Sequence, residues 1–320
     1  MEFVNQTSFP SLIHRTAIGE DLIAMSVMCR LTYDINNGEA TISENQEWEL
    51  YQDFWESEYG PMDKDDVYCR GGVDVMIFGS AKAPKGKTVT QSEVVISLNN
   101  KEIHKVKVYG NRVWNSFLGV LSKSSPEPFK EIELSLHNAF GGVTNWDGVV
   151  IPYPSNPYGK GYYQNKEDAI GNPLPNIEHA DNLINKWREW QEPSGVASLP
   201  IMPLKAKLNL VLNEDKTGIE RLDDKFFNSA FPELIVDEIL PGDILKVDGV
   251  TGGEAFSLVI PETTLEIEIL LGETKAKRNM TIDQVGVVPD KNQVFISYRF
   301  PFRYVVKPQE KRATILSLIN

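Results

Sequence analysis

The residue types that most often carry chemistry are few in this chain and lie far apart. Its 320 residues include four histidines and two cysteines. His104, with lysines on either side in a strand-like run, is expected to be an exposed strand residue, and His137 to be a hydrogen-bonded structural residue. Glu178–His179 lacks the second histidine of a zincin helix. The histidines therefore predict no metal site; they are His14, His104, His137 and His179.

The cysteines and glycine pairs do not indicate a reactive centre either. Cys29 and Cys69 have apolar or aromatic neighbours, so we expect buried, reduced thiols rather than a disulfide framework. The chain has no Gly-x-Ser-x-Gly nucleophile motif. Gly71–Gly72 and Gly252–Gly253 predict turns, because no Lys-Ser/Thr pair follows at the spacing of a phosphate loop.

Two adjacent acid pairs, Asp65–Asp66 and Asp223–Asp224, are expected to be solvated charge in loops. Glycoside hydrolysis needs two carboxyl groups whose separation is spatial, so paired acids for that chemistry stay open. The sequence thus predicts a protein that is not an enzyme, with no catalytic residue, no metal and no cofactor. The alternative is a carbohydrate-active hydrolase with a β-sandwich fold.

Composition and net charge indicate which classes of partner to expect. A hydrophobic content of 41% is enough for packed cores, and no apolar run approaches the ~18 residues of a membrane span. The formal net charge of -13 argues against nucleic acid and against anionic lipid. The opening residues Met1–Pro10 lack the basic and apolar regions of a secretory leader. We therefore expect a cytoplasmic protein without membrane insertion.

Apolar and polar residues alternate along much of the chain, which is typical of half-buried antiparallel strands. Turn residues separate these runs. We expect a mainly β fold of antiparallel sheets, sandwich or barrel-like, in two parts and with few helices. The clearest alternating runs are Met25–Leu31, Val73–Ile77, Val94–Leu98, Val106–Val108, Leu204–Leu212, Leu265–Leu271 and Val294–Phe300.

Helical spacing is clearest between His179 and Gln191, where Asp181 is a plausible cap, so a helix is predicted over about 181–191. Gln46–Trp55 is a weaker helix candidate. The boundary between the two parts is expected near Pro193–Pro203. This gives an N-terminal β-rich region at 1–200 and a C-terminal antiparallel β region at 201–320.

The middle of the chain is rich in Gly, Pro, Asn and Tyr. Its block Tyr153–Tyr163 cannot run as a central strand, because each proline lacks a ladder donor, and it is too aromatic for a flexible linker. We expect a long ordered loop that either closes a sheet edge or forms a binding surface. The candidate partner-binding residues are Trp146, Tyr158, Tyr162 and Tyr163; Trp146 could instead pack under the loop.

Several blocks resemble one bacterial family along almost the whole chain. They are Met1–Arg15, Asp74–Pro84, Val108–Trp114, Pro126–Gly142 with its HNAFGG sequence, Tyr153–Tyr163, Pro173–Glu178, Phe226–Asp243 and Val285–Phe300. In this order they are similar to the bacterial domain-of-unknown-function 2169 family. The chain departs from the family pattern at Arg70–Val73, and its stretch Pro193–Pro203 is short.

The resemblance implies an effector adaptor, or chaperone, of the type VI secretion system. Such a protein would bind a cognate effector or its spike-tip (PAAR-like) domain, and possibly the spike protein (VgrG), in the cytoplasm and load the cargo onto the spike. A structural component of the secretion apparatus is a further alternative.

Overall fold

The computed structural model describes residues 1–319 and is mainly β. Strands contain 49% of the residues and helices 8%, so the predicted fold class is confirmed. The α-helices of the described chain are α1 (Lys166–Ala169) and α2 (Met202–Leu208). Short 3-10 turns occur at Leu136–Asn138, Asp224–Phe227, Pro232–Leu234 and Pro289–Lys291.

The largest sheet joins the two ends of the chain. It has seven strands in the order β2-β3-β27-β26-β7-β21, with β4 paired to β3, and only β26 and β7 run parallel. Its strands are β2 (Ser11–Ala17), β3 (Leu22–Asn36), β4 (Glu39–Ile42), β7 (Val73–Ile77), β21 (Ile235–Val236), β26 (Thr281–Val288) and β27 (Gln293–Val305).

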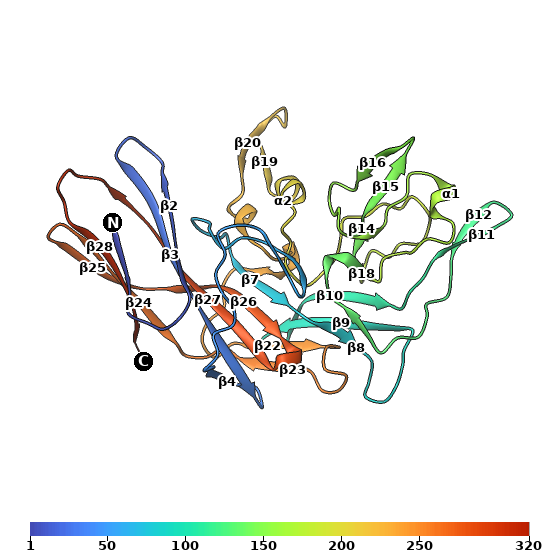
Figure 1. Ribbon diagram of the computed structural model, residues 1–320, viewed down its shortest axis with the longest axis horizontal. Coiled ribbons are helices and arrows are strands. Elements are labelled where there is room, and N and C mark those ends of the chain that lie inside the picture. Colours follow the sequence, from blue (N-terminus) through green and yellow to red (C-terminus); the bar gives the residue numbers. More distant parts are fainter. Residues whose placement is uncertain (320) are drawn as a thin grey trace.

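Two further sheets flank this one (Figure 1). The five-stranded sheet has the order β18-β10-β9-β22-β23, and the four-stranded sheet has the order β1-β28-β24-β25. Their strands are β9 (Gln91–Leu98), β10 (Lys101–Tyr109), β18 (Ile177–His179), β22 (Ile244–Asp248), β23 (Phe256–Val259), β1 (Glu2–Asn5), β24 (Thr264–Leu271), β25 (Thr274–Asn279) and β28 (Arg312–Ile319).

Six two-stranded pairs complete the described fold. They are β5 (Trp55–Ser57) with β6 (Gly60–Met62), β8 (Ser80–Lys82) with β13 (Glu131–Glu133), β11 (Trp114–Phe117) with β12 (Val120–Lys123), β14 (Phe140–Gly141) with β17 (Lys160–Gly161), β15 (Val143–Trp146) with β16 (Val149–Pro152), and β19 (Leu210–Leu212) with β20 (Ile219–Leu222). Several of them project from the body of the molecule (Figure 1).

The expected boundary near residue 200 does not separate the sheets. Strand β3 pairs along its length with β27, from Leu22 opposite Val305 to Asp34 opposite Gln293. Strand β7 pairs with β26, and β9 pairs with β22. Each of these pairs joins a strand before residue 200 to one after it. The parallel pair of β1 and β28 also places the two ends of the chain side by side (Figure 1).

The predicted helix at 181–191 is wrong. Ile184 is 3% exposed and packs into an aromatic cluster with Trp114 and Phe140. Backbone N–H groups that a helix would direct to carbonyls bond to carboxylates instead: Ile184 N donates to Glu178 Oε2 at 2.8 Å, and Glu189 Oε2 accepts from two further N–H groups. Side-chain acceptors therefore hold this segment in an irregular path.

Two other predicted elements also differ. Gln46–Trp55 forms no helix, because Trp48 packs on Phe295, with ring centroids 4.6 Å apart, and the neighbouring backbone bonds to buried side chains. The run Leu204–Leu212 is not one strand. It begins in α2, whose first turn contains Pro203, a residue favoured there because it needs no N–H partner. Only its end, in β19, is extended.

The block Tyr153–Tyr163 follows a fixed path. Asn156 is fully buried, and its Nδ2 donates to the carbonyl oxygens of Leu136 at 2.9 Å and Phe140 at 3.1 Å. Its Oδ1 accepts from the N–H of Tyr158 at 3.2 Å. Gly141 makes this approach possible, since a Cβ there would lie 2.1 Å from the Asn156 carbonyl oxygen. One amide thus joins the block to the preceding Phe140–Gly142 turn.

Replacing Asn156 with Ala should lower the free energy of unfolding by about 2–4 kcal/mol, because it leaves buried backbone groups without partners. Asn145→Ala is the control, since Asn145 is exposed and bonds only the N–H of Gly148. Urea denaturation measures both changes. Equal stabilities of the two variants would contradict the assigned role of Asn156.

Candidate functional site

The four aromatic residues predicted to bind a partner are not equally accessible. Trp146, on β15, and Tyr158 are each 45% exposed, whereas Tyr162 is 5% exposed. Tyr163 is partly buried, and its hydroxyl donates to the carbonyl oxygen of Pro173 at 2.9 Å. Trp146 and Tyr158 are therefore available to a partner.

Tyr162 belongs to a small second core. Its ring centroid lies 4.9 Å from that of Tyr153 and 5.3 Å from that of Trp190. Trp114 and Phe140 complete the same cluster. An aromatic residue in a loop can face solvent or fill a local core, and the sequence does not distinguish these cases. The side chain of Tyr162 packs in this small core and is not available to a partner.

Three two-stranded hairpins of the described chain expose many large apolar side chains, of which sequence reasoning named only Trp146. The hairpins β11–β12, β15–β16 and β19–β20 project from the body of the molecule (Figure 1). Their exposed side chains are Phe117, Leu118, Val120, Val143, Trp146, Val149, Val150, Leu210, Leu212, Ile219 and Leu222. Isolated hairpins are marginally stable in water, and exposed apolar patches mark interaction sites. We call these the apolar hairpins.

The turn of β11–β12 presents an apolar residue in a strained conformation. Leu118 and Gly119 form its two-residue loop, with φ values of 46° and 77°. Such turns favour Asn or Asp followed by Gly, as at Asp147–Gly148 in β15–β16. A bulky residue at positive φ is an outlier, and such strain gathers at functional sites. Leu118 is nonetheless 89% exposed, so no packing within the described chain accounts for it.

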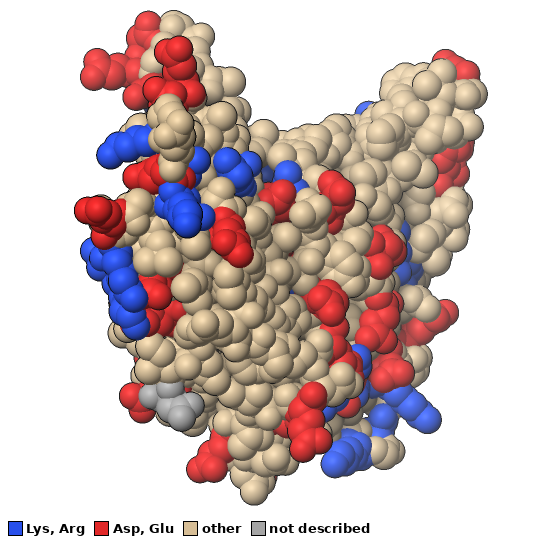
Figure 2. Space-filling view, turned by 60° about the vertical axis from the view of Figure 1, so that its left-hand side comes forward, with Lys and Arg blue, Asp and Glu red and all other residues tan. Residues whose placement is uncertain are grey.

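The surface that comes forward in Figure 2 has mixed charge. Lys and Arg side chains are interspersed with Asp and Glu, a broad central area is largely uncharged, and the surface is hollowed at the top between two projecting parts. This face therefore does not gather its basic side chains into one continuous patch, which is the usual footprint of a protein that binds a nucleic-acid backbone.

Charged side chains lie buried beneath one face of the large sheet. Four cations and four anions meet there, and each of their side chains is at most 8% exposed. Their formal charges cancel. We call them the buried ion network; its members in the described chain are Arg30, Arg70, Lys205, Arg299, Asp63, Asp65, Asp74 and Asp283.

Hydrogen bonds and ion pairs connect the network. Arg30 Nη2 donates to Asp65 Oδ1 at 2.6 Å, and Arg299 Nε donates to Asp283 Oδ2. Arg70 lies 3.3 Å from Asp74 and 3.5 Å from Asp283. Asp65 was expected to be solvated, and this is wrong because Arg30 and Arg70 neutralise it in the interior.

Asp74 has the least exposed side chain in the buried ion network. Burial raises the pKa of Asp74, and Arg70 opposes this rise. Its two carboxylate oxygens also accept from Asn228 Nδ2 and from the N–H groups of Ser229 and Ala230, at 2.9–3.1 Å. One carboxylate thus fixes the Asn228–Ala230 turn against the start of β7.

Asp74→Ala should lower the free energy of unfolding by about 3–5 kcal/mol, because it removes the carboxylate nearest to the buried Arg70 and the acceptor of the Ser229 and Ala230 N–H groups. Asp290→Ala removes a partly exposed partner of Lys82 and should change stability by at most about 1 kcal/mol. Chemical denaturation distinguishes the two. A change of less than about 1 kcal/mol for Asp74→Ala would contradict the role of the network.

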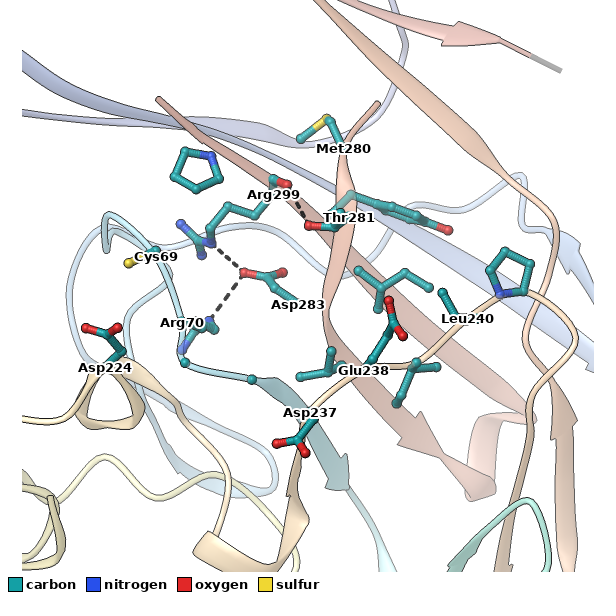
Figure 3. A pocket seen from close by; sticks show the side chains of 18 of the residues that line it. Cys69, Arg70, Asp224, Asp237, Glu238, Leu240, Met280, Thr281, Asp283 and Arg299 are labelled. Carbon is teal, nitrogen blue, oxygen red and sulfur yellow. Dashed lines mark hydrogen bonds and ion pairs between the residues drawn. The ribbon is translucent and has the colours of Figure 1, made fainter. Parts of the chain in front are cut away.

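A cavity of about 610 Å³ opens beside the network (Figure 3). Arg70, Arg299 and Asp283 form one wall, and Figure 3 shows Asp283 between the two guanidinium groups. The rest of the wall combines apolar side chains with acidic ones; these include Cys69, Ile239, Leu240, Met280, Ile282, Asp224, Asp237 and Glu238. Burial raises the pKa of the Cys69 thiol, which favours the protonated form.

His104 was expected to be exposed, but it is 4% exposed. It lies on β10, and with its Nε2 protonated it donates to the carbonyl oxygen of Gly195 at 3.2 Å. Its ring is 5.7 Å from that of His179, which lies 3.9 Å from Glu233. Burial, the largest effect, lowers the pKa of His104. His137 is exposed and contacts Tyr158 edge-on.

This lowered pKa predicts acid destabilisation. Below about pH 6.5 the unfolded chain binds a proton at His104 while the folded chain does not, so stability falls as the pH falls. The loss should reach at most about 1.4 kcal/mol per pH unit. His104→Gln keeps a donor for Gly195 and should flatten the dependence between pH 6.5 and pH 5. Identical slopes for both proteins, measured by urea denaturation, would contradict the assignment.

Among residues 1–319, no group of three or more His, Cys, Asp or Glu side chains is arranged to hold a metal ion. Burial raises the pKa of Cys29 to about 12, so this thiol stays protonated. In the same described part of the chain, no helix combines the length and apolar character needed to cross a bilayer.

The fold and surface define a mainly β protein with projecting apolar hairpins. A family model described as "Uncharacterized protein conserved in bacteria (DUF2169)" matches residues 20–299. The chain belongs to this family. Searches of curated proteins and of solved structures found no match.

Proposed function

We propose that this protein is an adaptor that binds a type VI secretion effector, or its spike-tip domain, and loads it onto the secretion spike. Membership of the family supports the proposal, because the sequence blocks that resemble effector adaptors lie within or beside residues 20–299. The observation that carries it is Leu118, an exposed leucine at positive φ. Its conformation costs stability in the free protein, so its benefit lies in a complex.

The apolar hairpins suit this function. They present exposed apolar side chains from three separate projections, and aromatic residues, here Trp146 and Phe117, often dominate binding energy. A partner that contacts several hairpins at once would remove their apolar side chains from water. This explains why strands with few neighbours of their own carry so much apolar surface.

The cavity fits binding better than hydrolysis. A glycosidase needs a carboxylic acid and a carboxylate that face each other across the substrate. Here Asp283 is paired with Arg299 and lies near Arg70, and the side chain of Asp237 is 99% exposed. These acids therefore favour an adaptor over a carbohydrate-active hydrolase.

Deletion of the gene tests the proposal directly. An adaptor serves one cognate cargo, so delivery of one effector should be lost while others are still secreted. Loss of all secretion would indicate a structural component of the apparatus instead. Normal delivery of every effector would contradict both functions.

Leu118→Asn separates binding from folding. Asparagine tolerates positive φ, so the variant should be as stable as the wild type or up to about 1 kcal/mol more stable. Its affinity for the effector lost in the deletion strain should fall at least about 30-fold, as expected for an apolar anchor worth about 2 kcal/mol. Calorimetry measures affinity and urea denaturation measures stability.

Gln309→Asn is the matched control. Gln309 is exposed and also has a positive φ (61°), but it lies outside the apolar hairpins. Its substitution should leave the affinity unchanged. Unaltered binding by Leu118→Asn would show that the strained leucine does not contact the cargo.

A further inference from the structure

The cavity beside the buried ion network lies where β7 joins the large sheet later than its parallel neighbour β26. Strand β26 begins at Thr281, but its first partner in β7 is the pair Gln284–Asp74. On the edge of β26 that faces β7, no strand of the described chain pairs with residues 281–283. The flank of β26 at its beginning is therefore open toward the cavity.

Gly71 and Gly72, directly before β7, allow the chain to stay away from β26 until β7 begins. A Cβ at Gly71 would lie 2.5 Å from the backbone nitrogen of Lys225, and one at Gly72 would lie 2.7 Å from the carbonyl oxygen of Val236. The chain thus turns away directly before β7 in contact with two other backbone segments. This turn is what leaves the space beside β26 unfilled.

Unpartnered polar atoms line the space. Arg70 Nε and Nη2 and Asp283 Oδ1 are buried and have no hydrogen-bond partner among residues 1–319. The side chain of Arg70 is 1% exposed and that of Asp283 is 8% exposed. Asp283 also lies at the irregularity between Ile282 and Gln284 in the β26–β27 pair, and bulges of this kind redirect side chains. The site therefore offers both donors and an acceptor.

The rim adds negative charge. Asp224, Asp237 and Glu238 lie at the cavity, beyond the neutralised Arg–Asp wall (Figure 3). Apolar walls come from Leu240, Met280 and other side chains. A volume of about 610 Å³ is within the range of ligand sites, ~300–1,000 Å³. An anion would be repelled by this rim, whereas a cationic group would be attracted.

We propose that this cavity binds a short, extended segment of the cargo in which apolar and basic residues alternate. The segment adds to the open flank of β26, where its backbone supplies both N–H and C=O groups, and strand addition is a common mode of peptide recognition. Its carbonyl oxygens accept from Arg70, a basic side chain meets Asp237 and Glu238, and apolar side chains fill the walls. This inference rests on the proposed adaptor function and specifies the chemistry of its partner.

The first test uses a labelled peptide, acetyl-Leu-Lys-Ile-Arg-Val-amide, and its acidic counterpart with Glu and Asp in place of Lys and Arg. Fluorescence anisotropy should show that only the basic peptide binds the wild-type protein. The double variant Asp237→Lys/Glu238→Lys should bind it at least 10-fold more weakly. Both positions are exposed, so the fold should be retained. The double variant Glu254→Lys/Glu273→Lys, at two exposed acidic positions outside the cavity lining, changes the net charge by the same amount and should bind normally.

Cys69 reports occupancy of the cavity itself. It is partly exposed and lines the cavity, whereas Cys29 is buried and serves as the internal control. A saturating amount of the basic peptide should slow the reaction of Cys69 with N-ethylmaleimide at least 10-fold. Binding without protection of Cys69, or equal binding by all the variants, would place the peptide elsewhere on the acidic surface and overturn the inference.

The outcomes also separate this inference from the proposed function. If the peptide does not bind while gene deletion still abolishes delivery of one effector, the cavity inference is wrong and the adaptor function stands. If the peptide protects Cys69 but every effector is delivered normally, the cavity inference stands for a peptide ligand and the adaptor function is wrong. Leu118→Asn should bind the peptide with wild-type affinity, because the cavity and the apolar hairpins are separate surfaces.

Discussion

The fold depends on a sheet whose polar face is buried. Along β3 the polar residues Ser26, Arg30 and Thr32 are at most 3% exposed, although alternation of this kind usually places them in water. Segment 46–70 covers them, and Asp65 of the buried ion network neutralises the charge of Arg30. Each cation is stable there only while its carboxylate is present, since an unpaired buried charge is strongly destabilising. The network thus fixes how the two ends of the chain meet.

This constraint divides the molecule into a rigid scaffold and the surfaces it presents. Strands β3, β26 and β27 are buried over most of their lengths and join residues from both ends of the chain. The apolar hairpins project beyond that scaffold, and the cavity lies where β7 begins, beside the network. A buried sheet that carries exposed apolar hairpins is the arrangement expected of a protein that binds by preorganised contacts.

The strands were largely predictable, because a period of two is a local signal. Val73–Ile77 matches β7, and Leu265–Leu271 lies within β24. The predictions that were wrong concern residues whose environment depends on contacts with distant parts of the chain. Asp65 is neutralised by Arg30, 35 positions away, and Tyr162 fills a local core that its neighbours in sequence do not reveal. The strain at Leu118 is a backbone property that becomes visible only in the structure.

If the apolar hairpins are the surface that binds cargo, a bound effector must shield their backbones from solvent. Hydrogen–deuterium exchange of the purified protein, alone and with the effector whose delivery depends on it, tests this most directly. Exchange should be slower in the complex over 114–123, 143–152 and 210–222, with little change over the already buried β3 and β27. Unchanged exchange in all three hairpins, in a complex shown to have formed, would contradict it.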